Sequence, residues 1–270
     1  MVTPFMLVSD ETDCPSPDVL SVSASKDGMF AAAFGKGIFR KHHDGNWSQA
    51  DRGLPDGVVV NRLQVIDGSV YVCSNKGLFY HEANCWYPTD ITIPCYQVVK
   101  QGVFFAAATE YGLWCKIGTR WENVAYPNTA IYDLLLTPQF YILGSRQGIS
   151  LYDRYTDSGA EFPIGIAITS LAVYHGHLLG VTKEGELVQG DKKGGFTKIG
   201  FEGLAIYSLK STETGVYVCT SRGLYLLQKM GSRLILRSIL TGFPVTDMNG
   251  SGDCMYVATL NWGIKKVVFQ

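Results

Sequence analysis

The residues with the clearest chemical potential are two aspartates and an arginine. Asp133, Asp247 and Arg62 each lie near the start of a short, mainly apolar run. Two carboxylates can act as general acid and base when burial and a nearby cation separate their pKa values. A guanidinium can instead hold a carboxylate or phosphate through two parallel hydrogen bonds. These three residues therefore indicate either an acid–base pair or an anion-binding site.

Equivalent runs elsewhere in the chain carry a polar residue at the same place. The seven positions are Ser21, Arg62, Gln97, Asp133, Ser170, Ser208 and Asp247. A tyrosine precedes three of them, at Tyr96, Tyr132 and Tyr207. A buried polar group without a partner costs about 1 to 3 kcal/mol, so this pattern needs a physical cause. Either the seven side chains bond to one another and to channel water, or they and the tyrosines form a funnel for an anionic or polar ligand.

The elements that position these residues follow from a repeat of glycines. One glycine recurs every 35 to 40 residues, between two short apolar runs, at Gly37, Gly77, Gly112, Gly148, Gly185, Gly223 and Gly263. Two strands joined at a glycine form a β-hairpin. A repeated four-stranded unit of roughly 40 residues is typical of a β-propeller blade. The sequence thus predicts an all-β, seven-bladed propeller with four-stranded antiparallel blades.

The repeat runs through residues 1–270 without a linker, which predicts a single domain. The expected blades are 18–57, 58–94, 95–130, 131–167, 168–205, 206–244, and 245–270 together with 4–9. The last unit has only three strands of its own, so residues 4–9 are expected to complete it and close the ring. In the fourth unit, residues 155–159 indicate a longer connection before the outer strand.

Composition limits the classes of function. Charged residues make up 17% of the chain and the formal net charge is −1, so we expect neither nucleic acid nor a membrane as partner. The seven cysteines form no Cys-x-x-Cys pair, and we expect no metal and no cofactor. The amino-terminal residues lack the basic and apolar regions of a signal peptide. We therefore expect a cytoplasmic monomer.

The second unit carries the motifs of a known repeat. They are Gly53-Leu54-Pro55-Asp56-Gly57, Val60 to Leu63, Asp67-Gly68, Val70-Tyr71-Val72 and Lys76-Gly77-Leu78-Phe79. This pattern resembles the two-component-regulator propeller repeat and is similar to sialidase-like repeats, although Cys or Ser replaces the Gly-Thr that the family often has. The resemblance implies a seven-bladed ring and a role in sensing or binding. It supplies no catalytic residues.

In a propeller, the connections into the inner strands and the turns between second and third strands lie on one face, around the channel. The residues of that face that we expect to bind a ligand are Arg62, Gln97, Tyr96, Tyr132, Tyr207, Lys36, Lys76, Arg146, Arg222 and Trp262. The preferred hypothesis is a non-catalytic module that binds a protein partner or a small anionic ligand. The alternative is a cofactor-independent isomerase, cyclase or lyase that uses Asp133 and Asp247. A deep aromatic cavity would favour small-molecule chemistry, and a flat face with exposed Trp262 and Tyr111 would favour a protein partner.

Overall fold

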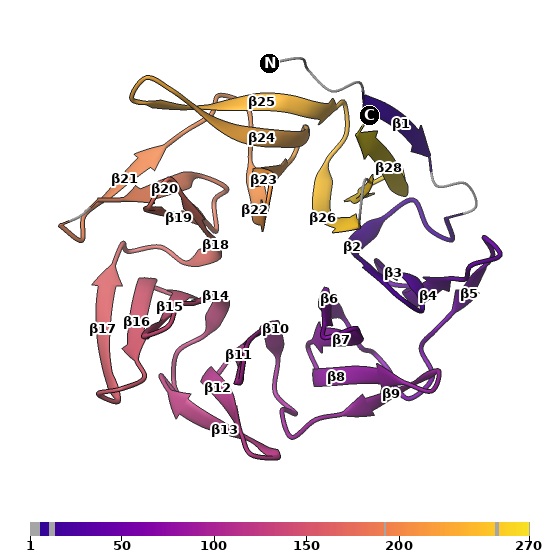
Figure 1. Ribbon diagram of the computed structural model, residues 1–270, viewed down its shortest axis with the longest axis horizontal. Coiled ribbons are helices and arrows are strands. Elements are labelled where there is room, and N and C mark those ends of the chain that lie inside the picture. Colours follow the sequence, from indigo (N-terminus) through magenta and orange to yellow (C-terminus); the bar gives the residue numbers. More distant parts are fainter. Residues whose placement is uncertain (1–5, 11–13, 192, 252–253, 270) are drawn as a thin grey trace.

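The computed structural model describes residues 6–10, 14–191, 193–251 and 254–269. The strands form seven four-stranded sheets, which surround a central axis as the blades of a ring (Figure 1). All the strand pairs within these sheets are antiparallel. The predicted all-β, seven-bladed propeller is confirmed. Within the described ranges, no helix has the length and apolar character needed to cross a membrane.

The first two strands of each blade line the channel and support its wall. The inner strands are β2 (Val19–Ser25), β6 (Val60–Ile66), β10 (Cys95–Gln101), β14 (Ile131–Leu136), β18 (Ile168–Tyr174), β22 (Ile206–Thr212) and β26 (Val245–Ser251). The second strands are β3 (Gly28–Ala33), β7 (Ser69–Ser74), β11 (Phe104–Thr109), β15 (Phe140–Ser145), β19 (His177–Thr182), β23 (Gly215–Thr220) and β27 (Cys254–Thr259).

The other two strands of each blade lie toward the outside of the ring. The third strands are β4 (Gly37–Lys41), β8 (Gly77–Glu82), β12 (Gly112–Ile117), β16 (Gly148–Asp153), β20 (Leu187–Gly190), β24 (Gly223–Met230) and β28 (Ile264–Phe269). The outer strands are β5 (Trp47–Gln49), β9 (Cys85–Pro88), β13 (Arg120–Ala125), β17 (Ser158–Pro163), β21 (Phe196–Ile199), β25 (Arg233–Thr241) and β1 (Met6–Asp10).

The outer strand of the seventh blade comes from the amino-terminal part of the chain. Strand β1 pairs with β28 in a register that runs from Met6 opposite Phe269 to Asp10 opposite Lys265. The strand expected at residues 4–9 therefore has its described part at Met6–Asp10, and residues 4 and 5 lie outside the described residues. Figure 1 shows β1 beside β28 at the rim of the ring.

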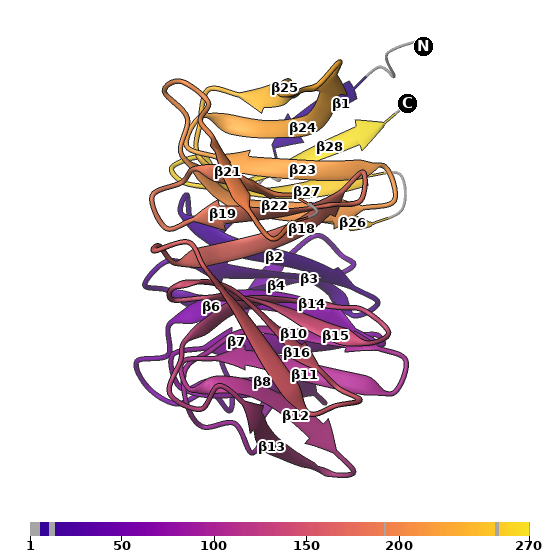
Figure 2. The same cartoon turned by 90° about the vertical axis from the view of Figure 1, so that its left-hand side faces the viewer.

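The ring has two broad faces, which are seen edge-on in Figure 2. We call the face where the inner strands begin the top face, and the face where they end the bottom face. Because the strands are antiparallel, the turns between second and third strands also lie on the top face. The turns that follow the inner strands and the third strands lie on the bottom face.

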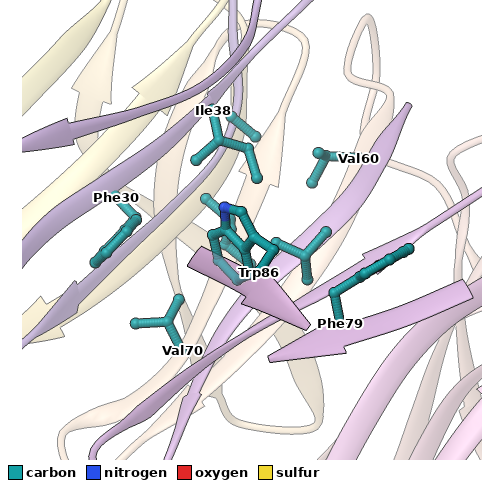
Figure 3. Close-up of a cluster of buried hydrophobic side chains, with 9 residues drawn as sticks. Phe30, Ile38, Val60, Val70, Phe79 and Trp86 are labelled. Carbon is teal, nitrogen blue, oxygen red and sulfur yellow. The ribbon is translucent and has the colours of Figure 1, made fainter. Parts of the chain in front are cut away.

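A separate apolar cluster fills each of the seven seams between neighbouring blades. Figure 3 shows the cluster between the first two blades, in which Phe30 and Ile38 of the first blade face Val60 and Trp86 of the second. The Trp86 indole is 2% exposed and its Nε1 donates to the Ala50 carbonyl at 2.6 Å. The alternation of strand side chains thus places apolar groups on both faces of each blade.

One detail of the fourth blade differs from the expectation. The connection expected at residues 155–159 is residues 154–157, because β17 begins at Ser158. It is longer than the two-residue connections before β9, β13 and β25, but shorter than the five-residue connections before β5 and β21. The Asp153 carboxylate accepts hydrogen bonds from the backbone amides of Tyr155, at 2.8 Å, and Thr156, at 3.3 Å. An aspartate that caps a turn in this way lets the chain reverse over a few polar residues.

The repeated glycine is required because two chain segments meet at it. The backbone of Gly77 has a φ of 122°, and a Cβ at this position would lie 2.1 Å from the Ile91 carbonyl oxygen. That same oxygen accepts a hydrogen bond from the amide of Leu78 at 3.0 Å. Neither the conformation nor the contact leaves room for a side chain.

We expect Gly77→Ala to lower the free energy of unfolding by about 2 kcal/mol or more, because it adds a clash to a left-handed backbone. The matched variant is Gly68→Ala, where φ is 78° and no atom lies within 4 Å of the added Cβ. Its cost should be about 1 kcal/mol, from the backbone conformation alone. Denaturant unfolding of both proteins measures the difference, and equal losses would contradict this account.

Candidate functional site

Each inner strand contains a β-bulge directly before the polar residue that recurs at the same place in every blade. The pairing with the second strand skips one residue in every blade, at Leu20, Asn61, Tyr96, Tyr132, Thr169, Tyr207 and Thr246. A bulge leaves one residue outside the ladder and redirects the side chains that follow it. The three tyrosines of the predicted site are thus all bulge residues.

The polar side chain after the bulge reaches the inner strand of the next blade. In five blades its oxygen accepts a hydrogen bond from a backbone amide there: Ser21 from Leu63 at 3.0 Å, Gln97 from Leu134 at 2.8 Å, Asp133 from Leu171 at 2.7 Å, Ser170 from Leu209 at 3.0 Å, and Asp247 from Val22 at 3.3 Å. We call these contacts the inter-blade links. They give the polar positions a structural role.

The second blade makes its link from a different residue. A guanidinium has no acceptor, so Arg62 cannot fill this role. Gln64, two residues further along β6, accepts from the Val98 amide at 2.9 Å instead. The signal that would have revealed Gln64 is its place on the same side of the strand as Arg62, since side chains repeat every two residues.

Arg62 is paired with the carboxylate of Asp133. Its Nη1 lies 3.4 Å from Oδ1 of Asp133, and its side chain is 16% exposed. Burial by itself lowers the pKa of the Arg62 guanidinium, but the charges of Asp133 and Asp247 outweigh it and raise that pKa above its usual value. Arg62 is therefore a charged group whose partners belong to the protein.

Asp247 is surrounded by donors. Its Oδ2 accepts from the Ser21 hydroxyl at 2.5 Å and from the Val22 amide, and its Oδ1 accepts from the Met248 amide at 2.9 Å. Nζ of Lys210, on β22 of the sixth blade, lies 2.5 Å from the same Oδ1. Three hydrogen bonds and one ion pair thus converge on the Asp247 carboxylate.

Asp133 has a similar environment. It is 3% exposed, and it accepts from the amides of Leu134 and Leu171 in addition to its contact with Arg62. Both aspartates thus act as buried acceptors that connect blades.

The tyrosines of the predicted site do not form one wall. Tyr96 and Tyr132, from neighbouring blades, have ring centroids 5.1 Å apart in an edge-to-face arrangement, whereas Tyr207 belongs to the sixth blade and is 40% exposed. The Tyr96 hydroxyl donates to Oε2 of Glu110 at 2.5 Å. Burial, and then this hydrogen bond, raise the pKa of Tyr96 well above its usual value. Glu110 also pairs with Arg146, at 3.0 Å between Oε1 and Nη2.

The remaining predicted residues lie exposed on the top face. Lys36, Lys76, Arg146 and Arg222 are in turns between second and third strands, and each is exposed. Trp262 is 57% exposed and lies beside Phe243, with ring centroids 6.3 Å apart. Two exposed apolar residues of this face, Phe34 and Val59, are missing from the sequence prediction. Among the described residues, no three His, Cys, Asp or Glu side chains gather as a metal site would require.

No protein-family model and no curated protein sequence matches the chain. Solved structures do match its fold. The extracellular domain of the hybrid two component system named BT4673, from B. thetaiotaomicron, has a TM-score of 0.74 and 16% identity over 97% of this chain and 39% of that one. The chain therefore spans about two fifths of that domain.

Two further structures match along their whole length. Virginiamycin B lyase from Staphylococcus aureus has a TM-score of 0.73 and 12% identity over 98% of this chain and 99% of that one. YCF48, solved bound to a D1 peptide, has a TM-score of 0.69 and 12% identity over 98% and 97%. At such identities these likenesses show the fold alone, that of a seven-bladed β-propeller.

The inter-blade links predict opposite outcomes for two serines on one strand. Ser21→Ala removes the acceptor of the buried Leu63 amide and a donor to Asp247, and should lower the free energy of unfolding by about 1 to 3 kcal/mol. Ser23 is fully buried and its Oγ has no hydrogen-bond partner. Ser23→Ala should therefore be neutral or stabilising. Thermal unfolding compares the two, and a Ser21→Ala protein as stable as wild type would contradict the role of the link.

Proposed function

We propose that this propeller is a non-catalytic binding module that recognises a protein partner through its top face. The observation that carries the proposal is a set of large apolar side chains exposed on that face. They come from four blades and one connection between blades: Phe34, Val59, Tyr111, Tyr207 and Trp262. Phe34 is 65% exposed and Tyr111 is 52% exposed. Four of these five side chains are aromatic, and aromatic residues are enriched in protein interfaces. The bottom face also exposes apolar side chains, but among the described residues only two of them, Phe104 and Tyr155, are aromatic.

Charged side chains stand among these apolar groups. Lys36, Lys76 and Arg222 are exposed in the same set of turns, and Arg146 is exposed beside Glu110. A protein interface commonly has an apolar and aromatic centre with a polar rim. Aromatic residues such as Tyr111 and Trp262 are also the types that contribute most to binding energy when a partner covers them.

The small anionic ligand is the weaker possibility for this face. That hypothesis depended on Arg62 as the cation at the bottom of a funnel, and Arg62 lies against Asp133. The Arg62 side chain is also only 16% exposed, so little of its guanidinium is accessible to a ligand on the top face. The enzymatic alternative loses support for a related reason. The carboxylate oxygens of Asp133 and Asp247 already accept hydrogen bonds from groups of the protein.

The structural comparisons agree with the proposal at the level of the fold. The YCF48 structure contains a D1 peptide, so a propeller of similar size and shape binds a protein segment. That peptide is a property of YCF48, and the partner of the present chain has to be found by experiment.

Site-specific photocrosslinking in the native cells tests the proposal. A photoreactive phenylalanine analogue replaces Tyr111 or Trp262 on the top face, and Val103 or Tyr155 on the bottom face as matched exposed positions. We expect a discrete protein adduct from the two top-face positions and none from the two bottom-face positions.

A second substitution distinguishes binding from chance contact. Phe34→Asp, combined with the probe at position 262, should lower the adduct yield about tenfold or more by placing a charge in the interface. Phe34 is exposed, so the folded protein should be unaffected. Adducts that form equally from both faces, or that persist with Phe34→Asp, would rule out the proposed surface.

A further inference from the structure

A cavity of about 640 Å³ opens on the bottom face, opposite the proposed protein-binding surface. Its walls come from β22 and β26 of the sixth and seventh blades, and from β6 of the second blade across the channel. Sites for small molecules are commonly about 300 to 1,000 Å³ in volume. The cavity therefore has the size of a metabolite site.

The cavity lies along the seam between the sixth and seventh blades, where the contacts differ from the inter-blade links of the other seams. By analogy with the other blades, Ser208 should accept from the Met248 amide. Instead, the Ser208 hydroxyl donates to the Thr246 carbonyl at 3.4 Å, and the Met248 amide donates to Asp247 of its own strand. Lys210 bridges the seam by its ion pair with Asp247. At this seam a lysine side chain thus connects the two blades and lies in the cavity wall. At the other seams the connection is a side-chain oxygen that accepts from a backbone amide.

Two amide side chains in the cavity wall have fixed orientations. Oε1 of Gln64 accepts from the Val98 amide at 2.9 Å, and Oδ1 of Asn249 accepts from the Ala24 amide at 3.1 Å. Because each oxygen is bound to the backbone, the NH₂ group of each side chain points away from it. Both residues line the cavity, and neither NH₂ group has a hydrogen-bond acceptor among the described residues.

The acceptors near these donors are already used. Asp247, which also lines the cavity, receives hydrogen bonds from Ser21, Val22 and Met248 and the ion pair from Lys210. An ammonium group carries three N–H donors, and Lys210 spends one on this carboxylate. Lys210, Gln64 and Asn249 therefore keep N–H donors for a ligand. Two carboxylates line the same cavity: Asp247, which is paired with Lys210, and Glu213, which is exposed at the rim.

We propose that this cavity binds a small organic oxyanion, a carboxylate or a phosphate ester, through Lys210, Gln64 and Asn249. Charge-assisted hydrogen bonds from an ammonium group and two amide groups are the contacts that such an anion needs. The site is independent of the top face, so ligand binding and partner binding use different residues.

Isothermal titration calorimetry with citrate and with inorganic phosphate, at low ionic strength, tests the site. The informative variants are Gln64→Glu and Asn249→Asp, because each keeps the oxygen that accepts from the backbone and replaces the NH₂ donor by an acceptor. Each should weaken binding about tenfold or more. Thermal unfolding without ligand checks that both variants fold like wild type.

Two controls complete the design. Glu213→Gln removes the rim carboxylate and should strengthen binding. Gln97→Glu makes the same amide-to-acid change at an inter-blade link that does not line the cavity, and should bind like wild type.

The two probes distinguish the sources of the oxyanion. Saturable binding of citrate alone assigns a carboxylate ligand, and saturable binding of phosphate alone assigns a phosphate. Either result supports the proposal when both cavity variants lose it. No saturable binding of either probe to wild type, or binding that Gln64→Glu and Asn249→Asp leave unchanged, overturns it.

Discussion

The structure depends on one hydrogen bond repeated around the axis of the ring. Each blade is a separate sheet, so no backbone ladder joins one inner strand to the next. A side-chain oxygen replaces the missing ladder: Asp133, for example, accepts from Leu171 at 2.7 Å. Without it, a buried amide would remain unsatisfied at a cost of about 1 to 3 kcal/mol. The bulge before the polar residue is what turns the side chain toward its neighbour.

The exceptions to this pattern mark the places where the channel carries charge. Arginine in the second blade cannot accept, so Gln64 makes the link and Arg62 reaches Asp133 across the channel. At the seam between the sixth and seventh blades, Lys210 bridges to Asp247. The channel thus holds two ion pairs, Arg62 with Asp133 and Lys210 with Asp247, in which each charged group has a partner within the protein.

The fold could be predicted from the sequence because its determinants are local. The glycine period and the alternation around it are visible in the chain, and Gly77 shows the physical reason, since the Ile91 carbonyl occupies the space of a side chain. The seven polar positions were also visible. Their partners were not, because Ser21 meets Asp247 only after the ring has brought together residues 226 apart in sequence.

The candidate site was harder to predict for the same reason. Exposure decides which residues can contact a partner. From the sequence, Phe34 looks like an ordinary apolar residue of a strand, whereas in the structure it lies in a turn and is exposed to solvent. Lys210 and Asn249 lie late in their strands, where the sequence gives no sign that the bottom of the channel is hollow. Which side chains share a face, and which of them line the cavity, becomes visible only in three dimensions.

Native-state hydrogen exchange tests the central claim most directly, by measuring the opening of the linked amides. If the inter-blade links hold the ring together, the amides of Leu63, Leu171 and Leu209 should exchange only through global unfolding. Their free energies of opening would then equal the global free energy of unfolding. Exchange of these amides through local opening, at a much lower free energy, would contradict the account.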